Sequence, residues 1–371
     1  MVVKQNSQYT FKYNKKLGRH GWLRLTPAYS VKMVEHILND LDYTPQCLFE
    51  PFSGTGTTEL VCANKRISSF ACDVNPFLVW LASTKTAFYT NVQILEFVEE
   101  YTHILSIVDG ADEYAYPNIF HIERWWHKRQ LSFLAKLKTC IWSVNDKVVA
   151  DLLKVAFCRE IIALSNAAFN HVSTSFGDSE DDSTFTFEDG KMSFASICEA
   201  IAESLKDQPV ARTDVSLHNS MSVFANTFQP FDTLITSPPY PNRISYIREL
   251  RPYMYWLGYL NTPDDASNLD WNTIGGTWGS ATSKLSTWKK QTLLPDYLFN
   301  IADNISKAEN RSAGLMANYV LKYFDDMAIH IQSVYNAIQP GGTVHYIVGN
   351  SNFYGNSVPS EKIYTDILSS V

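Results

Sequence analysis

The apolar residues Leu234 and Ile235 lead the chain into Ser237-Pro238-Pro239-Tyr240. Two consecutive prolines cannot donate to a β-ladder or continue a helix, so a strand must end there in a rigid elbow. The elbow fixes the direction of the Pro238 carbonyl beside the Ser237 hydroxyl, and Tyr240 adds an aromatic face. This sequence therefore places a hydroxyl, a carbonyl of fixed direction and an aromatic face close together at the end of a strand. A proline-rich turn with a buried tyrosine is the alternative interpretation.

A second cluster, the glycine turn Ser53 to Thr57, follows the apolar stretch 46–52. It has two of the three glycines of a dinucleotide fingerprint, which favours a nucleoside ligand without a pyrophosphate. Asp73 lies 17 residues after Gly56, where an acid can accept hydrogen bonds from ribose hydroxyls. The start of the next helix favours an aliphatic carboxylate, and Glu50 would suit an ammonium group. A tight strand–helix turn without a ligand is the alternative.

Alternating strand and helix patterns must position these two clusters. Strands are expected at 46–52 and 69–74 around a helix at 58–65, which is the opening of a doubly wound α/β sheet. The middle of the chain has helical spacing and an acidic, polar loop or hairpin at 177–190. Further strands follow from residue 214 and at 341–349. The expected helices of the middle region are 92–105, 130–141 and 148–168.

Composition limits the class of protein. The chain has 371 residues, a net charge of −7 and six isolated cysteines, none in a CxxC pair. This pattern argues against a zinc site or a disulfide framework and favours a reducing, cytoplasmic location. No apolar run reaches the 18 to 20 residues that a membrane helix needs, and no secretory signal is expected. The acidic balance means that any nucleic-acid surface must be local.

Two motifs in this order resemble those of the amino-group DNA methyltransferases, which form N4-methylcytosine or N6-methyladenine. Phe49 to Thr57 (FEPFSGTGT) is similar to their S-adenosylmethionine motif, and Thr236 to Tyr240 (TSPPY) is similar to their catalytic motif. The segments 20–38, 72–86, 245–260 and 323–355 extend the resemblance to about two-thirds of the chain. Serine at the first position of the catalytic motif favours cytosine N4 over adenine N6. No cysteine follows a proline, which excludes a C5-cytosine enzyme.

The resemblance implies a fold, a cofactor and partners. The expected fold is a Rossmann-like α/β methyltransferase sheet interrupted by a largely helical insertion. The cofactor would be S-adenosylmethionine, with S-adenosylhomocysteine as product. The partners would be double-stranded DNA and a companion endonuclease or second subunit, as in a restriction–modification system, with no membrane. The implied catalytic residues are Ser237, Pro238, Pro239 and Tyr240. The implied cofactor residues are Thr26, Pro27, Glu50, Phe52, Ser53, Gly54, Thr55, Gly56, Thr57, Asp73, Val74 and Asn219.

The sequence departs from the family pattern in two places. Asn219 stands where family members usually have an acid that contacts the amino group of the cofactor's adenine. The side-chain oxygen of Asn219 can still accept that hydrogen bond. Family members normally add two more strands after the fifth, so we expect missing C-terminal strands, a partner that supplies them, or a sheet completed differently. The expected domains are a cofactor half (1–90), a helical insertion with possible target recognition (91–212) and a catalytic half (213–371) with a loop insertion near 262–312.

Basic residues mark three candidate DNA-binding segments. Residues 123–138 combine five Lys or Arg residues with Trp125 and Trp126, which predicts either a phosphate-contacting surface or a helix with buried tryptophans. The second segment follows the elbow. The third is the stretch 275–290, whose composition predicts a loop. The candidate nucleic-acid residues are Arg124, Lys128, Arg129, Arg243, Arg248, Lys284 and Lys289. An RNA N-methyltransferase and a catalytically inactive DNA-binding subunit remain alternatives to a DNA methyltransferase.

Overall fold

The computed structural model describes residue 9 and residues 11–23, 28–168, 175–176, 184–222, 230–276 and 280–371. The chain divides into two compact units, each assembled from separate stretches of sequence. The helical unit comprises residues 1–31, 83–209 and 249–262. The sheet unit comprises residues 32–82, 210–248 and 263–371. Within the described part of the chain, no helix is both long and apolar enough to span a membrane.

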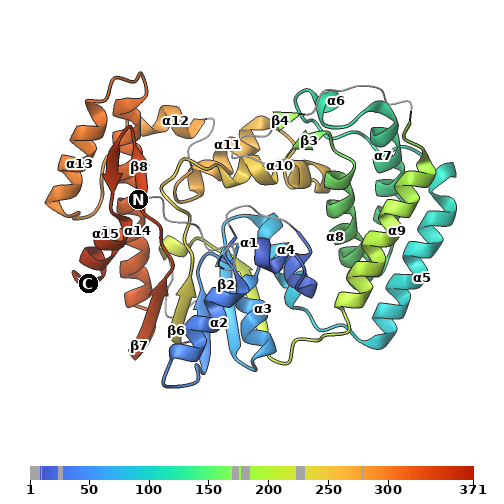
Figure 1. Cartoon of the computed structure of the whole chain (residues 1–371), viewed down its shortest axis with the longest axis horizontal. Coiled ribbons are helices and arrows are strands. Elements are labelled where there is room, and N and C mark those ends of the chain that lie inside the picture. Colours follow the sequence, from blue (N-terminus) through green and yellow to red (C-terminus); the bar gives the residue numbers. More distant parts are fainter. Residues whose placement is uncertain are drawn as a thin grey trace. The chain divides into compact units, whose positions relative to one another are not determined.

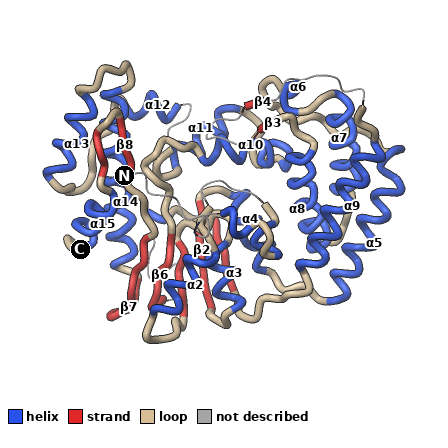
Figure 2. Tube along the Cα trace, in the orientation of Figure 1, coloured by secondary structure: helices blue, strands red, loops and turns tan. Residues whose placement is uncertain are grey.

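The sheet unit contains a parallel five-stranded sheet with the strand order β5-β2-β1-β6-β7. The strands lie side by side in Figure 2, and the predicted Rossmann-like α/β fold is confirmed. The glycine turn follows β1, and the elbow follows β6. The strands are β1 (Cys47–Glu50), β2 (Ser68–Asp73), β5 (Thr213–Leu217), β6 (Phe231–Thr236) and β7 (Ile338–Tyr346).

Apolar side chains explain why the central strands form. Phe49 of β1 stacks on Phe70 of β2 with ring centroids 4.6 Å apart, and Phe231 of β6 lies 5.1 Å from Phe49. All three rings are buried, together with Leu234 of β6 and Val334. Parallel strands covered on both faces carry such continuous apolar runs. The two edge strands, β5 and β7, are only partly buried.

Helices cover the sheet and form a second core beside it. α3 contacts β1, β2 and β5, while α14 packs on α13, α12 and α15 (Figure 1). A short antiparallel hairpin, β8–β9, follows β7. The helices of this unit are α2 (Val31–Asp40), α3 (Thr57–Asn64), α11 (Pro263–Asn272), α12 (Ser280–Leu285), α13 (Asp296–Ser306), α14 (Ala313–Tyr335) and α15 (Ser360–Leu368), with β8 (Ser351–Phe353) and β9 (Asn356–Val358). Two further helices, α4 (Pro76–Thr86) and α10 (Tyr246–Leu257), begin in the sheet unit and end in the helical unit.

The helical unit packs long helices around an apolar core, and capping residues define where they begin. Thr90 and Gln93 form a capping box at the start of α5, and Asp146 accepts a hydrogen bond from the amide of Val149 at the start of α8. α8 contacts α5, α7 and α9. The long helices are α5 (Asn91–Ile107), α7 (Lys128–Trp142), α8 (Lys147–Ala163) and α9 (Phe187–Ser204); the short elements are α1 (Phe11–Asn14), α6 (Ile122–Trp125), β3 (Ala167–Ala168) and β4 (Ser175–Phe176).

Two expectations about these elements were wrong. The helix expected at 148–168 ends at Ala163, and Ala167–Ala168 pairs with Ser175–Phe176 as a short hairpin. The stretch 262–312, expected to be a loop insertion, contains α11, α12 and α13. α11 begins with Pro263 and two aspartates, which suit a helix start, and Leu285 of α12 is buried against neighbouring apolar residues. The division of domains at residues 90 and 212 stays a prediction.

Candidate active site

The geometry of a parallel sheet places the two motifs together. β1 pairs in parallel with both β2 and β6, so the carboxyl ends of these strands meet at one edge of the sheet. Glu50 ends β1, Asp73 ends β2, and Thr236 ends β6 immediately before Ser237. Ligands of open α/β sheets bind at this edge, where the loops after the strands converge. The edge is therefore the candidate active site.

The glycine turn has a backbone that requires its two glycines. Gly54 has φ of +52° and Gly56 has φ of +73°, values in the left-handed region that disfavours residues with a side chain. A Cβ on Gly56 would also lie only 3.0 Å from Cβ of Ala82 in α4. A Cβ on Gly54 would meet no atom nearer than 3.8 Å. Gly56 therefore serves packing as well as conformation, while the space above Gly54 is open.

Glu50 is fully buried and its carboxylate is held by three donors. Oε1 accepts hydrogen bonds from the amide of Phe52 at 3.0 Å and from the hydroxyl of Thr236. Oε2 accepts a hydrogen bond from the hydroxyl of Thr58 at 3.0 Å. The carboxylate thus joins the glycine turn, the first turn of α3 and the residue before the elbow. Its contact with a ligand ammonium group stays a prediction.

Asp73 organises the other side of the turn. Its Oδ2 accepts a hydrogen bond from the amide of Gly54 at 3.0 Å, and its Oδ1 accepts one from the amide of Asn75 at 2.9 Å. Burial raises the pKa of Asp73 to about 6, against the opposing effect of these backbone donors. The Val74 amide also donates to this carboxylate. A carboxylate has about four acceptor positions, so one remains for a hydrogen bond from a ligand.

The residues around this turn fit a cofactor of the S-adenosylmethionine type. The Ser53 hydroxyl is buried and has no hydrogen-bond partner among the residues that the structure describes, as expected of a group that a ligand satisfies. Asn219 follows β5, and its side-chain oxygen accepts a hydrogen bond from the amide of Met221 at 3.0 Å. Among the other predicted cofactor residues, Phe52 and Val74 are half-buried and Thr55 and Thr57 are buried. Thr26 and Pro27 lie outside the described residues.

The elbow holds Ser237 and Tyr240 against each other. The Ser237 hydroxyl donates to the Ile347 carbonyl at 3.3 Å and lies 3.1 Å from the Tyr240 hydroxyl. A serine hydroxyl has one proton, so in this arrangement Tyr240 donates and Ser237 accepts. Burial raises the pKa of Tyr240, which keeps the phenol protonated. Ser237 Oγ therefore retains one lone pair for a further donor.

Sequence analysis missed the aromatic residues that support the site. The Phe52 ring lies against His330, with centroids 4.9 Å apart. His330 donates from Nδ1 to the Ser220 carbonyl at 2.8 Å, so its Nε2 accepts from the Tyr346 hydroxyl at 2.9 Å. Burial lowers the pKa of His330 to about 4, so the ring is neutral near pH 7. The aromatic-rich stretch 319–364 was the available signal, but residue spacing alone did not indicate these partners.

The predicted basic residues are exposed, whereas their neighbouring tryptophans are not. Trp125 and Trp126 are 2% and 0% exposed and stack on each other in the helical unit. They therefore cannot stack on bases, which agrees with the alternative prediction of a helix with buried tryptophans. Arg124 stacks on Phe176, and Arg129 donates to the Phe185 carbonyl. The exposed basic side chains are Arg124, Lys128 and Arg129 in the helical unit, and Arg243, Arg248, Lys284 and Lys289 in the sheet unit.

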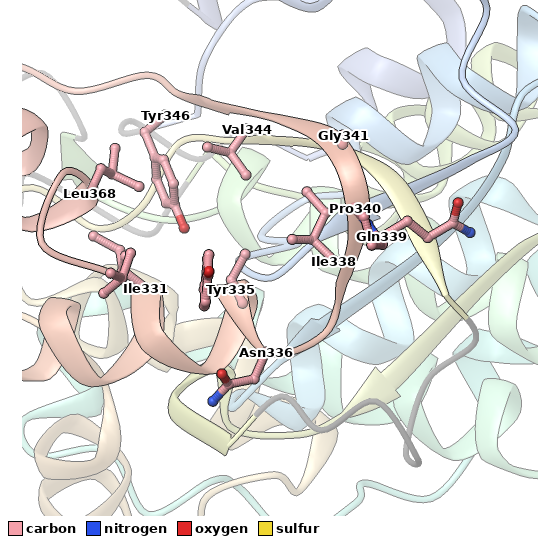
Figure 3. A pocket seen from close by; sticks show the side chains of 13 residues that line it. Ile331, Tyr335, Asn336, Ile338, Gln339, Pro340, Gly341, Val344, Tyr346 and Leu368 are labelled. Atoms are coloured by element: carbon pink, nitrogen blue, oxygen red, sulfur yellow. The ribbon is translucent and has the colours of Figure 1, made fainter.

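A cavity of about 620 Å³ lies at the edge strand β7, and one of its lining residues, Tyr346, pairs with Thr236 of β6 (Figure 3). Apolar side chains dominate its wall, and no residue of the glycine turn or elbow lines it. It is formed by the strand β7 and by the last turns of α14 and α15. Its lining includes Ile331, Tyr335, Ile338, Val344, Tyr346 and Leu368.

Comparison with known proteins agrees with the resemblance of the motifs. No protein-family profile matches the chain, and no solved structure matches it. The chain is similar to the Type II methyltransferase M.BsoBI of Geobacillus stearothermophilus, with 21% identity over an alignment of 422 residues. That alignment takes in 98% of this chain and 80% of the relative, so the similarity extends through both units.

Proposed function

We propose that the protein is an S-adenosylmethionine-dependent DNA methyltransferase of a restriction–modification or related defence system. Its target would be the exocyclic amino group of a flipped base, cytosine N4 ahead of adenine N6. The observation that carries the proposal is the meeting of the glycine turn, Asp73 and the Ser237 elbow at one edge of a parallel sheet. Similarity to a Type II methyltransferase along nearly the whole chain supports it.

The residues of the turn would hold the cofactor. The Asp73 carboxylate would accept hydrogen bonds from the ribose hydroxyls, and the Asn219 side chain would accept one from the adenine amino group. The orphaned Ser53 hydroxyl and the open space above Gly54 would accommodate the methionine portion. When bound, S-adenosylmethionine supplies an electrophilic methyl group on a sulfonium ion.

The elbow would prepare the amine for attack. The lone pair of an aromatic amine is delocalised into its ring, so the nitrogen must pyramidalise before it becomes nucleophilic. Ser237 Oγ and the Pro238 carbonyl would each accept a hydrogen bond from one of the two N–H groups of the amine, and this would favour that geometry. The ring would stack on Tyr240 after leaving the duplex. The nitrogen lone pair would form the new N–C bond with the methyl group that S-adenosylmethionine supplies, S-adenosylhomocysteine would leave with the electrons of the C–S bond, and the surplus proton of the nitrogen would pass to water.

Methyl transfer to DNA tests this proposal directly. Purified protein is incubated with methyl-labelled S-adenosylmethionine and duplex DNA, and the nucleosides are then analysed. We expect N4-methylcytosine, while N6-methyladenine would reassign the base. If the protein transfers the label only to RNA, the substrate is RNA and the protein is an RNA N-methyltransferase. A protein that binds no S-adenosylmethionine in calorimetry, even with DNA present, would instead be a non-catalytic subunit.

A serine substitution tests the role of the elbow. Ser237→Ala removes the acceptor, and we expect turnover to fall by roughly 10²- to 10³-fold with S-adenosylmethionine binding unchanged. Ser306→Ala, which removes an exposed hydroxyl at the end of α13, is the matched control and should leave turnover unchanged. Turnover that survives in Ser237→Ala would contradict the assignment of Ser237.

A further inference from the structure

The carbonyl of Pro239, the second proline of the elbow, is hydrogen-bonded to a residue of helix α14. Pro239 O accepts a hydrogen bond from the hydroxyl of Tyr323, in α14, at 2.7 Å. The hydroxyl of Tyr364, in α15, lies 2.7 Å from the same Tyr323 oxygen. A carbonyl can only accept, so the single Tyr323 proton points to Pro239 and Tyr364 must donate to Tyr323. The two tyrosines therefore form a directed hydrogen-bond chain that ends on the elbow.

This chain is buried and keeps its protons. Tyr323 and Tyr364 are 1% and 2% exposed. Burial raises the pKa of both phenols well above the ordinary tyrosine value, so both remain donors across the physiological pH range. A buried donor that lost its partner would carry a desolvation penalty, which holds the chain in this arrangement.

The two proline carbonyls of the elbow differ in their partners. No donor in the described part of the chain contacts the Pro238 carbonyl, whereas the Pro239 carbonyl is occupied by Tyr323. Proline fixes φ at both positions, so holding the Pro239 carbonyl also limits the rotation of the peptide before it. On the other side of the elbow, the Tyr240 amide donates to the Tyr246 hydroxyl at 3.1 Å. These two contacts and that of the Ser237 hydroxyl with the Ile347 carbonyl hold the elbow, and among the described residues the Pro238 carbonyl is the proline carbonyl left available.

We propose that Tyr323 and Tyr364 are positioning residues for methyl transfer. By holding the Pro239 carbonyl they fix the direction in which the Pro238 carbonyl points toward the reacting amine. This inference rests on the proposed function of the elbow. The tyrosines do not contact the substrate, so their contribution is to the rate of the chemical step and not to cofactor binding.

Removing one hydroxyl at a time tests the inference. Tyr323→Phe should lower kcat on the order of tenfold to a hundredfold, because a small displacement of an acceptor is costly, with KM for S-adenosylmethionine unchanged. Tyr364→Phe should lower kcat less, since Tyr323 can still donate to Pro239. Tyr297→Phe is the matched control: it removes a hydroxyl that donates at 2.7 Å to Asp366, in the same helix as Tyr364 but outside the chain that leads to Pro239, and it should keep the wild-type kcat.

A second readout needs neither cofactor nor DNA. Hydrogen–deuterium exchange of the peptide 240–246 should be faster in Tyr323→Phe than in the wild type, with the control unchanged. Wild-type kcat in Tyr323→Phe, or an equal fall in Tyr297→Phe, would overturn the inference. If Tyr323→Phe does not fold, an unchanged kcat in Tyr364→Phe overturns it. A wild-type protein that methylates nothing would refute the proposed function, while the exchange rates would still decide whether the tyrosines hold the elbow.

Discussion

The buried carboxylate of Glu50, at the end of β1, accepts a hydrogen bond from the hydroxyl of Thr236, at the end of β6. Glu50 belongs to the strand that enters the glycine turn, and Thr236 is the last residue before the elbow. A single side-chain contact therefore links the proposed cofactor turn to the proposed catalytic elbow. Because Glu50 is inaccessible to water, each donor to its carboxylate replaces a hydrogen bond that water would otherwise provide.

Replacing Thr236 should therefore destabilise the fold. Thr236→Val keeps the shape of the side chain but leaves the Glu50 carboxylate with one donor fewer. Hydrogen bonds to charged groups contribute about 1.5–3 kcal/mol, so we expect the free energy of unfolding to fall by that amount. Urea unfolding measures the change. Thr236→Ser retains the hydroxyl and should be less affected, and equal losses in the two variants would show that the hydroxyl is not responsible.

The two glycines of the turn should respond differently to alanine. Both Gly54→Ala and Gly56→Ala place a side chain at positive φ, which costs about 1–2 kcal/mol. Only Gly56→Ala also crowds Ala82 at 3.0 Å, and overpacking typically adds about 1–3 kcal/mol. In thermal unfolding, Gly56→Ala should therefore have a lower melting temperature than Gly54→Ala. The Cα of Ala82 lies 3.1 Å from the same added Cβ, so the backbone of α4 must move to relieve the contact. Equal stability of the two variants would contradict this difference.

The raised pKa of Asp73 predicts a pH dependence of stability. Its pKa in the folded protein is about 6, against the usual value of 3.8, so the folded state holds this proton more tightly than the unfolded state. The contribution of Asp73 to stability should thus decrease as the pH rises from about 4 to about 6, and level off above that. Denaturant unfolding across this range should show a shallower decline in Asp73→Asn. An identical slope in both proteins would mean that Asp73 titrates normally.

The exposed basic residues should set the salt dependence of DNA binding. In a plot of the logarithm of the binding constant against the logarithm of the salt concentration, each phosphate contact adds about −0.9 to the slope. Replacing Lys128 and Arg129 with glutamine should make the slope shallower by up to about two such contributions. Fluorescence anisotropy at several salt concentrations measures it. Lys147→Gln, which removes an exposed lysine paired with Asp151 in the same unit, is the control and should keep the wild-type slope.

Much of the fold could be predicted because its signals are local. The strand, glycine turn and helix at 46–65 follow from an apolar run, two glycines and helical spacing. Parallel pairing of β2, β1 and β6 then places Asp73 and Ser237 at the same edge of the sheet. The partners of buried polar groups could not be predicted in this way. Thr236 lies 186 residues from Glu50, and no local pattern indicates that their side chains touch.

The same limit explains the errors. Trp125 and Trp126 occur among basic residues, yet both are buried, because neighbours from distant segments such as Trp256 cover them. The stretch 262–312 is rich in turn-forming residues, but the burial of Leu285 against Ile274 and Leu294 favours helices there. Tertiary packing overrides local propensity in both cases.

The pairing of β1 with β6 also has a consequence for the order of folding. It joins two strands between which the chain passes through residues 83–209 of the helical unit. Pairings between distant segments form slowly, because the chain must close a large loop before any contact compensates for the lost entropy. The contacts of α7 with α8 and of α8 with α9 join neighbouring segments and can form early. We therefore expect the edge that carries both motifs to form late in folding, after much of the chain between them has folded.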